Sequence, residues 1–217
     1  MPEHTLESMT EIFDLADQLL FGRSKMFAPQ DLPGRYGRVV RAIDNLLQVL
    51  HVESVLAGGW AVWWHGYEGR LTQDVDIVLA GDAVADFLRA ASVAGFELLP
   101  QKPGRWPKLL HKETNIKVDI LPEGTRPGTV SKPAPTTIRH PAQMGATGSA
   151  LRYITLPALL ELKIAAGRDR DQADVVALLR ANPKQVDTIR AHLEAIHEDY
   201  VKEFDRLFLR SREEDER

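Results

Sequence analysis

Asp74 and Asp76 are separated by one apolar residue and are followed by three aliphatic residues at 77–79. Such a run of β-formers predicts a strand, and because successive side chains alternate across a sheet, both carboxylates would project from the same face. Two like charges side by side are unfavourable unless a metal ion, a basic partner or open water compensates them. The spacing therefore indicates a candidate site for a divalent cation.

A third carboxylate, Asp119, lies in a second predicted strand at 115–121. Ile116, Val118 and Ile120 alternate there with Lys117 and Asp119, which is the pattern of a half-buried strand. If the two strands are neighbours, three carboxylates can share two Mg²⁺ ions about 4 Å apart, with water and substrate phosphates as the remaining ligands. This arrangement is typical of in-line phosphoryl chemistry.

Gly58 and Gly59 follow an apolar stretch at 55–57 and precede a helix predicted to start near Trp60. Glycine lets the backbone approach a ligand closely, and free N–H groups at a helix start bind phosphate. Arg70 lies just before the acidic strand, where a triphosphate would gather. Its alternatives are a solvated loop arginine and a counter-ion of Asp74.

Lys163 interrupts an apolar helical stripe that contains Leu156, Leu159 and Leu160, at a position where another leucine is expected. A lysine placed there either extends to the surface or meets an anion. The alternative is an exposed helix turn with ion pairs inside the helix. If the helix continued through Gly167, Arg170 and Asp174 would lie close to the face of Lys163.

These pieces together resemble the DNA polymerase β-like nucleotidyltransferase superfamily, whose pattern is a Gly-Gly or Gly-Ser turn, an Asp-x-Asp strand and a later carboxylate on a strand. More narrowly, Gly-Gly-Trp-Ala-Val at 58–62, His-Gly-Tyr at 65–67 and the run Arg70-x-Thr72-x-Asp74-x-Asp76 resemble the bacterial branch that includes the AbiEii abortive-infection toxins. The resemblance covers roughly residues 50 to 180.

The resemblance implies transfer of NMP from an NTP to a hydroxyl acceptor, either tRNA or a small molecule, with Mg²⁺ as cofactor and a toxin-like role with an antitoxin partner. It implies catalytic and metal-binding roles for the three carboxylates, Asp74, Asp76 and Asp119. It implies nucleotide binding by Gly58, Gly59, Arg70, Thr72 and Lys163. The superfamily's later aspartate matches Asp171 or Asp174, and many members have Ser where this chain has Gly59. The alternative from another class is a non-catalytic nucleotide-binding or interaction module that retains the fold.

The order of predicted elements gives an α/β (α+β) fold: a mixed β-sheet with helices on one side, plus N- and C-terminal helices. We expect three regions, 1–50 with helices that pack on the core, 51–155 as the catalytic core and 156–217 as a C-terminal helical region. In the first region the apolar stripe that includes Phe13 and Leu20 is expected to pack on the core. The irregular stretch at 122–149 contains a candidate strand at 136–139, and residues 211–217 are expected to fray.

Trp60, Trp63 and Trp64 recur at helical spacing, which is more often core packing than a platform for base stacking. His65 could bind a metal or act as a base, but no partner stands at the usual spacing, so we assign it no chemistry.

The composition excludes several classes of protein. The chain has 217 residues, a formal net charge of −4 and no cysteine, so disulfides and thiolate zinc sites are excluded. No apolar run approaches the roughly 20 residues that span a bilayer, and no basic, apolar leader begins the chain, so we expect a cytoplasmic protein. The acidic balance argues against a broadly basic nucleic-acid surface but is compatible with a local basic groove, which a tRNA acceptor would require. A small hydroxylated acceptor would require a deep pocket.

Overall fold

The computed structural model describes residues 4–22, 25–101, 104–129 and 131–215. Its centre is a six-stranded mixed sheet with the order β3-β4-β5-β2-β1-β6. The strands are β1 Ser54–Leu56, β2 Asp74–Leu79, β3 Phe96–Leu98, β4 Lys108–His111, β5 Ile116–Pro122 and β6 Arg152–Tyr153. β2 pairs parallel with β5, and β1 pairs parallel with β6, whereas the other neighbours are antiparallel.

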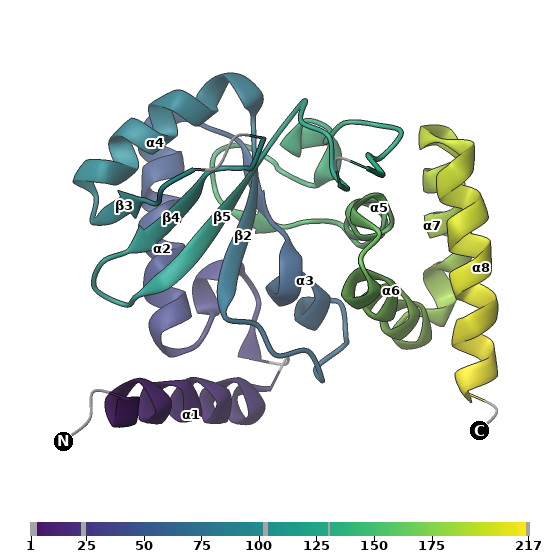
Figure 1. Cartoon of the computed structure of the whole chain (residues 1–217), viewed down its shortest axis with the longest axis horizontal. Helices are drawn as coiled ribbons and strands as arrows, with labels where there is room; N and C mark the ends of the chain where they lie inside the picture. The colour runs from purple at the N-terminus through teal and green to yellow at the C-terminus, as the bar shows by residue number, and fades with distance from the viewer. Residues whose placement is uncertain (1–3, 23–24, 102–103, 130, 216–217) are drawn as a thin grey trace.

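The alternation of side chains explains why one face of this sheet carries helices. On β5, Ile116, Val118 and Ile120 are buried, whereas Lys117 is exposed and Asp119 half-buried. Helices α2 (Gly34–Leu50) and α4 (Val84–Val93) lie behind β3, β4 and β5 in Figure 1, and α3 (Gly58–Trp64) packs beside β2. The aliphatic side chains therefore face the helices, and the carboxylates face the other way.

Four helices after the sheet form a group of their own at the right of Figure 1: α5 Leu156–Ala166, α6 Asp169–Ala181, α7 Val186–Ile196 and α8 Glu198–Asp215. α8 packs against α5, α6 and α7. Gly167 takes the left-handed conformation, with φ of 65°, directly after α5. A helix running unbroken from α5 into α6 is therefore excluded, because the chain turns at this glycine.

The first helix, α1 (His4–Phe21), departs from the expected packing. Phe13 and Leu20 are 64% and 79% exposed, so the prediction that this apolar stripe packs on the core is wrong for them. In Figure 1, α1 lies below the body of the molecule and touches it along one side. Its apolar face lacks a cover because no other described element crosses it.

The fold class predicted from the sequence is confirmed, with differences in detail. Residues 136–139 form no strand, because Ile138 bonds through its backbone to the turn at Gly124 and Thr125 instead of to a sheet neighbour. β6 was not predicted, and two residues are too short for a periodic signal. Fraying was predicted for 211–217, but α8 continues to Asp215, and residues 216–217 lie outside the described part of the chain. The division into three regions stays a prediction.

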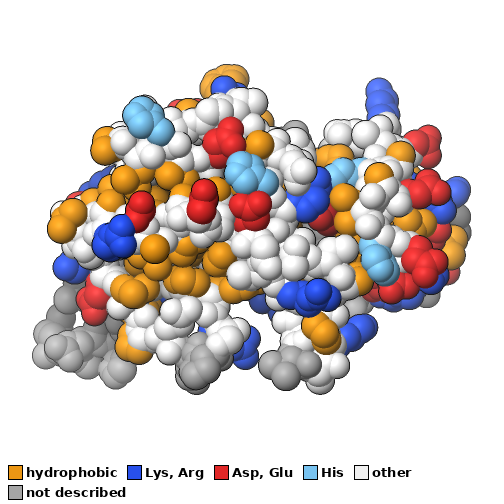
Figure 2. All heavy atoms as spheres, turned by 90° about the horizontal axis from the view of Figure 1, so that it is seen from above, with side chains coloured by type: hydrophobic (Ala, Val, Ile, Leu, Met, Phe, Trp, Pro, Cys, Tyr) orange, Lys and Arg blue, Asp and Glu red, His pale blue; other side chains and the backbone are white. Residues whose placement is uncertain are grey.

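Short 3₁₀ turns connect several elements: Pro29–Asp31, Gly81–Ala83, Pro141–Met144 and Pro183–Gln185. Among the described helices, none is both long and apolar enough to cross a bilayer. Figure 2 shows the molecule from above, with hydrophobic side chains gathered in the left half of the view and charged side chains of both signs at the right, over the C-terminal helices.

Candidate functional site

The three acidic side chains predicted to act together lie on two adjacent strands. β2 and β5 pair in parallel, with Asp76 directly opposite Asp119 and Asp74 opposite Lys117. Because paired residues of a sheet point to the same face, Asp74, Asp76 and Asp119 share the face that the helices leave uncovered. The predicted neighbourhood of the two strands is thus confirmed.

The electrostatics of this face are those of crowded carboxylates. Burial and, after it, the negative charges of Asp74 and Asp119 raise the pKa of Asp76 to about 7, while Lys163 and Lys108 act in the opposite direction. Lys108 stands opposite Asp119 in the β4–β5 pairing and forms an ion pair with it. The lysine compensates one carboxylate and leaves the repulsion between the other two.

The residues fit a hard divalent cation by type and place, although the present rotamer of Asp119 turns its carboxylate away from the other two. Within the described part of the chain, no three acidic or histidine side chains converge on one metal-sized point. Asp119 turns toward Lys108, and Asp74 accepts a hydrogen bond from the Thr72 hydroxyl at 3.2 Å. However, Asp119 Oδ1 is buried without a hydrogen-bond partner, and an oxygen-only donor set is what Mg²⁺ prefers. Binding would therefore require rotation of the Asp119 side chain away from Lys108.

The two glycines pack directly against this acidic face. Gly58 has a φ of 61°, and a Cβ added to it would lie 1.8 Å from Asp76 Oδ2. A Cβ on Gly59 would lie 2.6 Å from the Thr72 hydroxyl oxygen. The Ala57 N–H also donates to the Asp76 carbonyl at 2.8 Å. Both positions therefore require glycine for close contact with Asp76 and Thr72, a reason that the sequence did not reveal.

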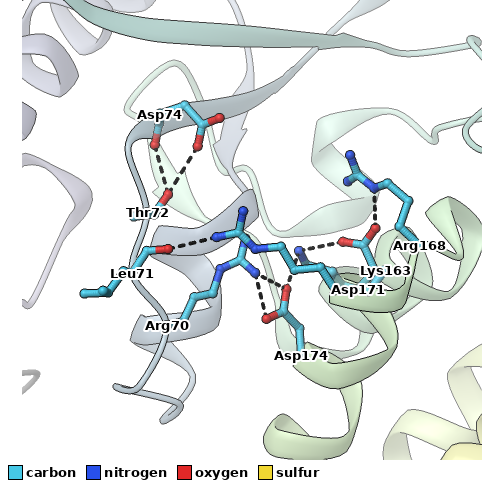
Figure 3. Close-up of polar contacts among 9 residues, drawn as sticks. Arg70, Leu71, Thr72, Asp74, Lys163, Arg168, Asp171 and Asp174 are labelled. Carbon is cyan, nitrogen blue, oxygen red and sulfur yellow. Dashed lines mark hydrogen bonds and ion pairs between the residues drawn. The ribbon is translucent and has the colours of Figure 1, made fainter.

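A network of buried ion pairs lies beside the carboxylates (Figure 3). Lys163, 7% exposed, contacts Asp171 at 3.0 Å and Asp174 at 2.8 Å, while Arg70 binds Asp174 through both carboxylate oxygens at 2.6 and 2.8 Å. Arg168 contacts Asp171 at 2.6 Å. Burial alone would raise the pKa of Asp171, but Lys163 and Arg168 outweigh it and hold that pKa below its ordinary value.

This network shows how the charged residues named from the sequence are paired. Asp171 and Asp174 both contact Lys163, and a match of either to the superfamily's later aspartate stays a prediction. The counter-ion of Arg70 is Asp174 and not Asp74, which corrects that alternative. Lys163 does meet an anion, and its partners come from the next helix, α6, rather than from its own turn.

A cavity of about 660 Å³ joins the acidic face to the ion-pair network. Its lining includes four acidic side chains, Asp74, Asp76, Asp119 and Asp171. The cationic side chains among its described lining are more numerous: Arg70, Arg105, Lys108, Arg126, Lys163, Arg168 and Arg170. The local charge is therefore opposite in sign to the net charge of the chain, which favours anionic ligands.

The aromatic residues near the site belong to the core. Trp60 and Trp63 are 1% and 4% exposed, and Trp64 stacks on Tyr153 with ring centroids 4.7 Å apart. His65 places Nε2 at 2.7 Å from the Ile154 carbonyl oxygen. The packing interpretation of the three tryptophans is thus confirmed.

The sequence reasoning missed several residues at the site, including Lys108, Gln18, Arg105, Arg126 and Arg168. Lys108 could have been found by aligning β4 against β5, because its position opposite Asp119 follows from the turn between these strands. Gln18, which binds Thr72 from α1, has no signal in the sequence, since 54 residues separate the two.

Comparison with protein-family models finds no match, and comparison with curated proteins finds none either. Among solved structures, the chain is similar to the crystal structure of ANT(2")-Ia in complex with adenylyl-2"-tobramycin, at 12% identity and a TM-score of 0.47, over 73% of this chain and 96% of that chain. The chain is also similar to the solution structure of the antibiotic-resistance factor ANT(2'')-Ia, at 14% identity and a TM-score of 0.41, over 82% of this chain and 92% of that chain. A third similar structure is that of an antigenic nucleotidyltransferase-like protein from Paracoccidioides brasiliensis, at 15% identity and a TM-score of 0.41, over 77% of this chain and 91% of that chain. These likenesses concern the arrangement of the chain and assign it no activity or ligand.

Proposed function

We propose that this protein is a Mg²⁺-dependent nucleotidyltransferase that moves NMP from an NTP to an acceptor hydroxyl. The observation that carries the proposal is the pairing of Asp76 with Asp119 across β2 and β5, beside Asp74 and at the edge of a cation-lined cavity. Like charges concentrated on one face are unfavourable for folding unless they are compensated, and Lys108 pairs with only one of the three carboxylates. A divalent cation bound to nucleotide phosphates would compensate the other two.

In this proposal Asp74 and Asp76 hold the magnesium, which neutralises phosphate charge when bound. The acceptor hydroxyl attacks the α-phosphorus, the bond from that phosphorus to the β-phosphate oxygen breaks, and pyrophosphate leaves. Asp119 takes the proton of the attacking hydroxyl.

Arg70 and Lys163 would bind the phosphates, with Gly58, Gly59 and Thr72 shaping the turn beside them. Asp171 and Asp174 hold both cations from the side, so their charges are oriented before a nucleotide arrives. Such preorganised charge accounts for much of the rate enhancement in phosphoryl transfer, and no covalent intermediate is needed.

The charge and the size of the cavity bear on the class of acceptor. Of the two classes left open by the sequence, a tRNA 3′ end requires a basic path, and Arg105 and Arg126 supply exposed positive charge on the cavity lining. The cationic lining thus favours a polyanionic acceptor. The cavity of about 660 Å³ also meets the requirement of a small hydroxylated acceptor for a pocket, so the labelling test includes both classes. A toxin-like role and an antitoxin partner have no specific contact in their support and are not part of the proposal.

The test compares wild type with Asp119→Ala, using each α-³²P-labelled NTP and Mg²⁺ with tRNA or hydroxylated small molecules as acceptors. Removal of the general base should lower transfer by about 10²-fold or more. Asp187→Ala, which removes an exposed carboxylate on α7, is the matched control and should transfer normally. Equal transfer by Asp119→Ala would refute its role.

A binding arm separates the enzyme from a binding module. If labelled NTP binds in a Mg²⁺-dependent way but no acceptor is labelled and no pyrophosphate forms, the non-catalytic alternative is correct. If tRNA is the acceptor, Arg126→Ala should weaken labelling of tRNA and reduce its salt dependence, while NTP binding stays unchanged.

A further inference from the structure

The attachment of α1 to the rest of the protein depends on polar contacts. Among α1 residues with described side chains, 10–21, only Gln18 is buried, at 7% exposed. The apolar side chains around it are largely exposed, including Leu19 at 66%. Burying an amide without hydrogen bonds is unfavourable, whereas burying leucine is favourable, so this pattern is the reverse of what helix packing alone would produce.

Both polar groups of the Gln18 side chain form hydrogen bonds with the backbone of Thr72. Gln18 Nε2 donates to the Thr72 carbonyl at 2.9 Å, and the Thr72 N–H donates to Gln18 Oε1 at 3.3 Å. This two-point contact is the one that a neighbouring strand would make. Thr72 precedes β2, has no strand partner there, and also receives a hydrogen bond from the Tyr36 hydroxyl at 3.2 Å. The Gln18 side chain thus supplies the two backbone hydrogen bonds that a neighbouring strand would otherwise make with Thr72.

Thr72 passes this constraint to the acidic face. Its hydroxyl donates to Asp74 Oδ1 at 3.2 Å and lies 3.3 Å from the Asp74 carbonyl oxygen (Figure 3). On its other side Thr72 packs on Gly59 so closely that no Cβ fits there. Gln18 thus holds the backbone of Thr72, and Gly59 lies against its side chain, so both contacts bear on the place from which the hydroxyl donates to Asp74.

We infer that Gln18 is a positioning residue that acts through Thr72 to orient the Asp74 carboxylate. The inference rests on the proposed function, because it assigns α1 a role in that same site. It gives a reason why a helix with so little apolar burial is held against the protein at this point. The consequence for catalysis is that the N-terminal helix belongs to the active site, although it supplies no group that touches the substrate.

The first test measures hydrogen exchange of the Thr72 amide in wild type, Gln18→Ala and the adjacent control Leu19→Ala. Gln18→Ala removes the acceptor of this amide, so its exchange should accelerate at least tenfold, while Leu19→Ala should leave it unchanged. This measurement does not depend on activity. Unchanged exchange in Gln18→Ala would overturn the inference, whether or not the protein transfers nucleotides.

The second test uses the kinetics of the full-length protein. Gln18→Ala should lower kcat about tenfold with KM for the NTP within twofold of wild type, because Asp74 is misplaced while the phosphate-binding cations are intact. Thr72→Ala should give a similar loss, Thr72→Ser should restore it, and the double variant Gln18→Ala/Thr72→Ala should be no worse than Thr72→Ala alone. Fully additive losses would show that Gln18 acts by another route and would overturn the inference.

Failure of the two proposals is distinguishable. A wild-type protein that transfers no nucleotide to any acceptor refutes the proposed function alone, and the exchange measurement then decides the role of Gln18. Active wild type with normal kcat in Gln18→Ala refutes the role of Gln18 alone. A general loss of fold in Gln18→Ala would appear as a lowered Tm, which is compared with the Tm of the adjacent control Leu19→Ala.

Discussion

The first and last helices, α1 and α8, are each 18 residues long and carry apolar side chains at helical spacing. α8 buries Tyr200, Phe204 and Leu207 completely or nearly so, whereas α1 leaves Phe13 and Leu20 largely exposed. The difference lies in the surroundings. α8 covers the surface formed by three other helices, while the described contacts of α1 are mostly polar, from Gln18 and from an ion pair of Asp14 with Arg35, with only Phe21 at its end packed against the core.

The comparison teaches that helical periodicity predicts a helix and its apolar face, but not whether anything covers that face. Hydrophobic burial holds the C-terminal helices, and specific polar contacts hold α1. A helix attached in this second way contributes little to stability and can still contribute to function. Three predictions test this contrast, in order of decreasing effect.

The largest difference in stability is expected between alanine variants of two phenylalanines, one on α8 and one on α1. Phe204→Ala empties a fully buried position of α8 and should lower the free energy of unfolding by about 3–5 kcal/mol. Phe13→Ala, at 64% exposed on α1, should change it by less than about 0.5 kcal/mol. Urea unfolding of both variants measures the two values. Similar losses would mean that α1 is held by hydrophobic packing after all.

An intermediate effect should come from Glu161, the buried carboxylate of α5. It accepts from Arg139 Nη2 at 2.7 Å and lies 2.8 Å from His192 Nε2, so it ties α5 to α7 and to the loop before α5. Burial alone would raise the pKa of Glu161, but its bonds to His192 and Arg139 outweigh this and hold the pKa below its ordinary value. Glu161→Gln should therefore lower stability at neutral pH by about 2 kcal/mol.

The sign of the pH dependence follows from that lowered pKa. A carboxyl group with a lowered pKa in the folded state stabilises the fold above its unfolded pKa, and this contribution disappears as pH falls through the folded value. The difference in the free energy of unfolding between wild type and Glu161→Gln should thus be constant near neutrality. It should shrink as the pH falls below about 4.5, the ordinary pKa of glutamate. Thermal unfolding from pH 3 to pH 8 measures it, with the exposed Glu194→Gln as control. A gap that persists in acid would contradict the assignment.

The smallest effect should come from the outer face of α1. Leu20→Ser replaces a side chain that is 79% exposed, so the Tm should stay within about 1 °C of wild type. If another surface covered this face in solution, the variant would lose stability and change its sedimentation behaviour. Analytical ultracentrifugation beside the thermal measurement distinguishes the two outcomes.

The sequence was sufficient for the parts of the fold that local patterns encode. Alternation identified β2 and β5, and the spacing of Asp74 and Asp76 placed both carboxylates on one face. That Asp119 joins them is a matter of strand order, which no local pattern contains. Its prediction depended on the resemblance and is confirmed by the parallel pairing.

Other features depend on contacts between distant segments. The bond from Gln18 to Thr72 and the pairing of Arg70 with Asp174 bridge 54 and 104 residues, and neither has a periodic signature. The prediction of a strand at 136–139 was wrong for the same reason, because the backbone of Ile138 forms its hydrogen bonds with the distant turn at Gly124 and Thr125. Patterns in the chain predicted elements, and packing decided what each element touches.

The parallel register of β2 and β5 has a consequence for how the chain tolerates insertions and deletions. Asp76 and Asp119 are held opposite each other by strand pairing, so the 36 residues between Leu79 and Ile116 can change in length without separating them. One residue added inside β5 before Asp119 would instead send its carboxylate into the layer of α2 and α4. Natural length variation should therefore accumulate around α4 and β3 and be absent within the two acidic strands.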